Sequence, residues 1–173
     1  MARFTHPSIL DVGGMSGLNP YHGAFYSSLD QSLALNTEGA MRFENTQLSQ
    51  GVSITNDSLG HPTRITMSEL GVYNIQFSAQ FYHTGGGGSG QTVNIWLKHN
   101  NNVEPDTATK LIVPSNAPYV VAAWNFFVQV DTLPQWFEIF WQTDNASVRI
   151  EHIDQNGNVP AVPSVILTVN QIA

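Results

Sequence analysis

The chain has 173 residues, the length of one domain and enough to bury a sizeable core. Hydrophobic residues make up 42% of it, which excludes a disordered chain. Charged residues make up only 11%, well under the roughly 25% typical of soluble domains. The net charge of −7, with six Lys and Arg, argues against a nucleic-acid partner. The absence of cysteine excludes disulfides, thiolate zinc sites and a cysteine nucleophile.

Solubility must therefore come largely from Asn, Gln, Ser and Thr. Burying an amide costs less free energy than burying a charge, so a surface with few charges and many amides favours subunits that pack against each other. The first residues lack the apolar segment of a secretory signal, and no apolar run reaches the roughly 18 residues of a membrane span. We therefore expect neither a secretory signal nor a membrane anchor.

Residues 1–23 show no sustained strand or helix period, and prolines and glycines interrupt them. They predict an extended N-terminal arm, followed by a domain over residues 24–173. The arm could dock on its own domain or on a neighbouring subunit, and we favour the neighbouring subunit. The apolar residues expected to anchor it are Phe4, Ile9, Leu10, Leu18 and Tyr21.

From residue 24 onward, short strands alternate with turns. The first four are expected at Ala24–Ser28, Ala40–Glu44, Gly51–Thr55 and Thr63–Met67. Gly71–His83 follows and has the clearest pattern. In it Tyr73, Ile75, Phe77, Ala79 and Phe81 alternate with Asn74, Gln76, Ser78 and Gln80. A period of two places the apolar set on one face of a strand, so we predict a long strand with one buried face.

After the flexible Gly85–Gly90 connector, five more strands are expected. They are Thr92–His99, Tyr119–Asp131, Gln135–Thr143, Ser147–Ile153 and Ser164–Ile172. No segment has convincing helical spacing, so the prediction is an all-β, two-sheet antiparallel jelly-roll sandwich. Gln135–Thr143 carries Phe137, Ile139 and Trp141 on one face but Trp136 and Phe140 on the other. A strand that is apolar on both faces must bury both, which predicts a second interface between subunits.

The order of these elements resembles the C1q/tumour-necrosis-factor-like jelly roll from Ala24 to the C-terminus. The resemblance is carried by a few short segments and is strongest in the Gly71–Phe81 strand. The other segments are Ala24-Phe25, Met41–Phe43, Ile65–Met67, Trp136–Trp141 and Val165–Val169. The turn Asp131–Gln135 departs from the family's leucine, then glycine-aspartate pattern.

Animal members of this family usually follow a collagen stalk or a membrane anchor, and this sequence shows neither. The disulfide-free, amide-rich chain looks more like the versions found in bacteriophage virion proteins. The resemblance implies a homotrimer with an aromatic-rich sheet near the threefold axis. Combined with the excess apolar surface, it suggests a trimer interface that contains Val121, Phe127, Trp136 and Phe140.

Candidate chemistry is sparse. None of the six histidines is spaced to place two metal ligands on one face of an element. Asp154, Asn156 and Asn158 have the spacing of a calcium loop, but Val165 stands where the bidentate glutamate belongs, so a hairpin turn is favoured over calcium. No nucleophile elbow or paired carboxylates are visible. We expect no catalytic residues, no cofactor and no enzyme activity.

These features lead to two competing functions. The first is a homotrimeric decoration (cement) protein on a phage capsid. Its arm would bind the major capsid or another virion protein, and it would be located in the virion after assembly in the host cytoplasm. The second is the receptor-binding knob of a tail fibre or spike, with the loops Gly85–Gly90 and Asn100–Asp106 presented to a host glycan. The fold alone does not separate the two.

Overall fold

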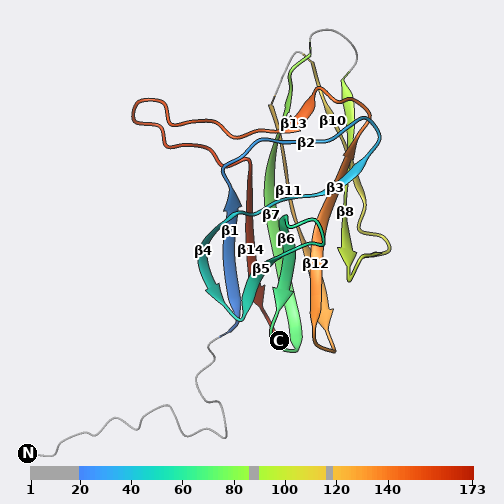
Figure 1. Ribbon diagram of the computed structural model, residues 1–173, viewed down its shortest axis with the longest axis vertical. Coiled ribbons are helices and arrows are strands. Elements are labelled where there is room, and N and C mark those ends of the chain that lie inside the picture. The colour runs from blue at the N-terminus through green and yellow to red at the C-terminus, as the bar shows by residue number, and fades with distance from the viewer. Residues whose placement is uncertain (1–19, 86–89, 116–118) are drawn as a thin grey trace, which may run out of the picture.

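The computed structural model describes residues 20–85, 90–115 and 119–173 (Figure 1). Over these residues the chain is built from strands, and no helix is present, so none could cross a membrane. The strands are β1 (His22–Ser27), β2 (Gln31–Ser32), β3 (Glu38–Ala40), β4 (Asn45–Gln50), β5 (Val52–Asn56), β6 (Pro62–Met67), β7 (Gly71–His83), β8 (Gln91–His99), β9 (Asn102–Val103), β10 (Thr109–Val113), β11 (Tyr119–Val130), β12 (Gln135–Thr143), β13 (Val148–Ile150) and β14 (Val165–Gln171).

The strands form two antiparallel sheets that pack face to face, which confirms the predicted jelly-roll class. In sheet A the order is β2-β13-β7-β14-β1-β4, and β11 pairs with the other edge of β7 over its full length. In sheet B the order is β10-β8-β12-β6-β5, with β3 added to β12 and β9 to β8. β7 and β12 are therefore internal strands, paired along both edges.

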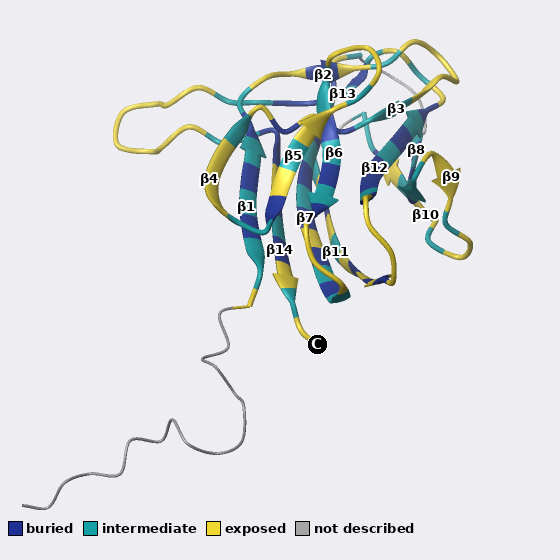
Figure 2. Cartoon of the chain, turned by 60° about the horizontal axis from the view of Figure 1, so that its bottom comes forward, coloured by how far each residue is buried: buried dark blue, intermediate teal, exposed yellow. Residues whose placement is uncertain are grey.

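The core lies between the two sheets and follows the period of two read from the sequence. Figure 2 shows buried and exposed residues alternating along β7, β11 and β14. Phe77, with 4% of its surface exposed, stacks edge-on against Trp124 and parallel to Phe126 across the β7–β11 pair. From sheet B, Trp141 meets Phe81 with ring centroids 5.5 Å apart. The predicted buried face of β7 is confirmed, and Phe137, Ile139 and Trp141 of β12 are buried against it.

The predicted strand Ala40–Glu44 is wrong in its bounds, because the ladder covers Glu38–Ala40 instead. Met41 and Phe43 are buried, but each makes a single backbone hydrogen bond, from Met41 N to Ile139 O and from Phe43 N to Pro62 O, both 2.8 Å. Buried and exposed residues alternate here because an extended segment packs on the core, not because the segment belongs to a paired strand.

The sequence did not predict β4 and β10, and both lie at the edge of a sheet. Most of their side chains are exposed, so their sequences lack the alternation that burial imposes. β4 reads Asn-Thr-Gln-Leu-Ser-Gln and pairs with β1 through a register shift between Ala24 and Phe25. Pairing with β1 places this polar strand in sheet A without any buried face of its own.

Gly71 starts β7 with φ +142°, a conformation that side chains rarely adopt. A Cβ there would lie 2.4 Å from Ala173 O. We expect Gly71→Ala to lower the free energy of unfolding by about 1–3 kcal/mol, measured by urea denaturation. Gly60→Ala is the matched control, because Gly60 also has positive φ (+84°) but nothing within 4 Å of its Cβ position. Equal losses in the two variants would show that contact with Ala173 is unimportant.

Candidate subunit interface

The outward face of sheet A carries no charged side chain over four adjacent strands. The register of β11, β7 and β14 and the alternation along β1 define which residues point away from the core. The outward positions are His22, Ala24, Tyr26, Val72, Asn74, Gln76, Ser78, Gln80, Tyr82, Tyr119, Val121, Ala123, Asn125, Phe127, Gln129, Ile166, Thr168 and Asn170. None is Asp, Glu, Lys or Arg. We call this surface the A face.

The A face is apolar where its exposure is greatest. Phe127 and Val121 on β11 have 65% and 59% of their surface exposed, and Tyr119 and Ile166 are also exposed. Between them lies a row of amides, in which Asn125 Nδ2 donates to Asn74 Oδ1 (3.0 Å). Because the amides bond along the sheet, part of their polarity is satisfied before any partner arrives.

Charges gather at the upper border of the A face. Arg149 of β13 forms ion pairs with Glu151 and with Asp30 (Nε to Oδ2, 3.4 Å), and its guanidinium lies 5.3 Å from the Tyr82 ring. The hydrogen bond that Arg149 donates to Glu151, together with the charge of Asp30, raises the pKa of Arg149 above its ordinary value. The cation is thus neutralised within its own subunit, at the edge of the neutral surface.

The four predicted interface residues do not lie on one surface. Val121 and Phe127 are on the A face, but Trp136 and Phe140 lie half-buried on the outward face of sheet B, on the other side of the sandwich. There Arg64 covers the Trp136 ring (4.6 Å) and Lys98 covers Phe140 (3.8 Å). Cations of their own sheet cover the faces of both rings, and one flat surface holds only the first pair.

Of the predicted arm residues, Phe4, Ile9, Leu10 and Leu18 lie outside the described residues. Tyr21 belongs to the domain, which corrects its assignment to the arm. Its carbonyl accepts from Gln171 N (2.8 Å), and its ring lies where a Cβ on Gly51 would stand. β1 then begins at His22, two residues before the predicted start.

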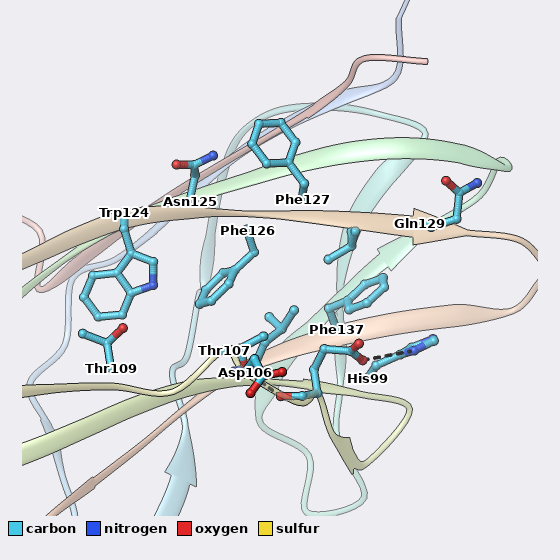
Figure 3. A pocket seen from close by; sticks show the side chains of 13 residues that line it. His99, Asp106, Thr107, Thr109, Trp124, Asn125, Phe126, Phe127, Gln129 and Phe137 are labelled. Carbon is cyan, nitrogen blue, oxygen red and sulfur yellow. Dashed lines mark hydrogen bonds and ion pairs between the residues drawn. The ribbon is translucent and has the colours of Figure 1, made fainter.

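A cleft of about 430 Å³ opens where β11 of sheet A faces the β9–β10 edge of sheet B (Figure 3). Trp124, Phe126 and Phe137 line it from within the sandwich, and His99 and Glu104 stand at its rim, 3.9 Å apart. The nearby Thr107 hydroxyl donates to Glu104 O (2.8 Å) and accepts from Leu97 N (3.1 Å). It therefore holds the β9–β10 loop against β8.

A second, polar cavity of about 400 Å³ lies beside the β5–β6 turn and includes Asp57, His61 and Glu138. Glu138 is buried on β12 and accepts from Thr63 Oγ1 at 2.5 Å. Throughout residues 20–85, 90–115 and 119–173, no three His, Asp or Glu side chains gather closely enough to hold a metal ion.

Asp57 stabilises the β5–β6 turn as an anion. Burial opposes its ionisation, but the backbone N–H groups of His61 and Leu59, both 2.8 Å from Oδ1, hold its pKa below the ordinary 3.8. A lowered pKa gives stability above about pH 4 that is lost as the pH falls through the folded-state value. We expect Asp57→Ala to lower the melting temperature at pH 7. In acid, where Asp57 is protonated, the variant and the wild type should melt at nearly the same temperature. Ser58→Ala, in the same turn, should change little at either pH.

The segment around Asp154 forms the favoured hairpin. Asn156 and Val159 exchange two backbone hydrogen bonds (3.0 and 3.1 Å), and Gly157 has φ +58° at the turn. The Asp154 side chain is fully exposed, with His152 Nε2 as its neighbour at 3.4 Å. Of the two proposed distal loops, Asn100–Asp106 includes β9, and residues 86–89 of the other lie outside the described residues.

Sequence reasoning missed the contributions of β1 and β14 to the A face. Ala24, Tyr26 and Ile166 all point outward there. A signal was present at Ile166, because Val165, Ile166 and Leu167 make a run that is apolar on both faces.

Comparison with known proteins identifies the architecture. No family model matches the sequence, and no curated protein matches it. Among solved structures, crystal structures of murine APRIL at pH 8.5 and pH 5.0 match with TM-scores of 0.53 and 0.52. Each is 9% identical, and each match covers 88% of this chain and 99% of that chain. The chain therefore has a jelly roll of the tumour-necrosis-factor-like class.

Proposed function

We propose that the protein is a non-enzymatic, self-assembling homotrimer whose subunits associate through the A face. The observation that carries this proposal is an outward sheet surface without one Asp, Glu, Lys or Arg, on which Phe127 and Val121 are the most exposed apolar side chains. The cores of protein interfaces are depleted in charge and enriched in aromatic residues. A tumour-necrosis-factor-like jelly roll is compatible with a threefold ring.

Within this class, we propose a decoration (cement) protein on the exterior of a phage capsid. The low charge content, the lack of cysteine and the arm residues before β1 support this role. A bound trimer would stabilise the shell by mass action, since it binds the assembled coat and not free coat subunits. The partners would be a second copy of the chain and a capsid protein, with no nucleic acid, membrane or cofactor.

Two measurements, made one after the other, test the proposal. Light scattering of the full chain at micromolar concentration should give three times the chain mass of 19.0 kDa. Cryo-electron microscopy of virions should then place the trimer on the head. A stable monomer would end the trimer proposal, and a trimer found at the tail tip would replace decoration with receptor binding.

The arm gives a separate prediction. Deleting residues 1–19 keeps Tyr21, which is part of the domain, so the truncated protein should remain a folded trimer with a nearly unchanged melting temperature. Its binding to capsids should fall sharply, because three arms per trimer contribute avidity. A co-sedimentation assay with undecorated capsids measures this. Unchanged capsid binding would show that the arm has no docking role.

The receptor-binding alternative depends on the β8–β9 turn. Asn100 and Asn101 adopt positive φ there, and Asn101, Asn102 and Val103 are exposed, as polar loops that contact a ligand would be. Adsorption of the isolated trimer to host cells, lost on replacing this turn with Gly-Ser, would favour the knob over the decoration protein.

A further inference from the structure

The A face has a knob and a hollow at different places. The knob is Phe127, on the edge strand β11. The hollow, of about 330 Å³, lies over β1, β4 and β14 and is lined mainly by apolar and hydroxyl groups. Its outward-pointing walls include Ala24, Tyr26, Ile166 and Thr168, with Pro163 at one end. Its volume is at the small end of the range that holds ligands, a size suited to one side chain.

No charged residue lines the hollow, and none shares the strand surface between it and Phe127. A phenyl ring entering it would therefore bury apolar surface on both sides without desolvating an ion. Phe127 is an uncharged, apolar side chain of this kind, and every copy of the chain carries it on its A face. This neutrality favours a second copy of the chain over a charged partner.

We propose that Phe127 of one subunit occupies the Ala24–Tyr26–Ile166 hollow of the next, so that the contact runs head to tail around the trimer. This inference depends on the proposed trimer and names the contact that forms it. Each subunit gives its knob to one neighbour and its hollow to the other, which closes a ring of three. In a twofold pair, by contrast, both knobs and both hollows would be filled between two chains.

The sheet register is compatible with this contact. Phe127 lies beside Asn74 on β7, and Asn74 lies beside Asn170 on β14. Thr168, in the hollow, is two residues from that row, about 7 Å along the strand. A rotation about an axis nearly parallel to the strands therefore brings β11 of one copy beside the hollow of the next, with a small tilt making up the difference.

The test uses the full chain with the photoreactive p-benzoylphenylalanine in place of Phe127, which keeps an aromatic knob. After irradiation, we expect covalent dimers and trimers on a denaturing gel. Peptide mapping should show attachment to residues 24–26 or 163–168. Mixing isotope-labelled with unlabelled chains shows that the attachment is between subunits. The same probe in place of Leu59, exposed in the β5–β6 turn away from the A face, is the matched control and should give no such products.

A second variant fills the hollow without touching the knob. Ala24→Trp should weaken trimer association at least tenfold and remove the attachment from position 127, while Ser53→Trp on exposed β5 should do neither. The outcomes separate the two proposals. If light scattering shows a trimer but the probe attaches to other residues, the proposed contact is wrong and the proposed trimer stands. Covalent dimers alone replace the ring with a twofold pair, and a monomer overturns both.

Discussion

Replacing Phe127 with aspartate is expected to convert the proposed trimer into folded monomers. In the trimer the new carboxylate would be buried without a cation, because no Lys or Arg points outward on β1, β7, β11 or β14. An uncompensated buried charge costs about 3–5 kcal/mol, and the ring contains three such contacts. Light scattering should show the mass fall to one chain. The circular dichroism of the monomer should stay native, because Phe127 is 65% exposed and contributes little to the core.

Leu59→Asp is the control for this substitution. Leu59 is more exposed than Phe127, at 77%, but it lies in the β5–β6 turn on the sheet B side. The same loss of an apolar side chain and the same added charge should leave the trimer intact there. If Phe127→Asp stays trimeric with native stability, the subunits associate through another surface.

The largest loss of stability is expected from Phe77→Ala. Phe77 is buried at the middle of β7 and contacts the rings of Trp124 (4.7 Å between centroids) and Phe126 (6.1 Å). Truncating a buried phenylalanine removes apolar burial and leaves a cavity, which together cost about 3–5 kcal/mol. Urea denaturation should compare chains with and without Phe77→Ala, both of which also carry Phe127→Asp. Both are expected to be monomers, so subunit association would not contribute to the measured difference.

Gln76→Ala is the neighbouring comparison. Gln76 is exposed on the A face, and its amide accepts a long hydrogen bond from Thr168 Oγ1 (3.4 Å). In the monomer background its loss should change the free energy of unfolding by under about 0.5 kcal/mol, as for most surface substitutions. Comparable losses at residues 76 and 77 would mean that the two faces of β7 are not divided between core and surface.

The elements that sequence reasoning predicted to the residue are those with one fully buried face. β7 and β12 match Gly71–His83 and Gln135–Thr143 because each is an internal strand with one buried apolar face, whose period of two can be read from the sequence. β4 and β10 are edge strands, so no comparable pattern was available. Short strands such as β2 depend on pairing with a distant partner, which local sequence does not reveal.

The exposed apolar residues of the A face were predictable in part. Val121 and Phe127 stood out because β11 is apolar on both faces, and both lie on the A face. Trp136 and Phe140 also make their strand apolar on both faces, but cations of sheet B pack on their rings. The cations that cover them, Arg64 and Lys98, come from β6 and β8, so only the folded sheet shows that these rings already have partners. A pattern along one strand does not report what the neighbouring strands supply.

The position of β14 has a consequence for the order of folding. β14 lies between β1 and β7 in sheet A, so β1 joins β7 only through a strand that is far from both along the chain. Val72 and the last two residues also exchange backbone hydrogen bonds, from Val72 N to Ala173 O and from Ile172 N to Val72 O, both 2.8 Å. Contacts so distant along the chain form slowly, and the A face stays incomplete until they do. The A face is therefore completed only when the whole domain has folded, and the association proposed through it would come after folding.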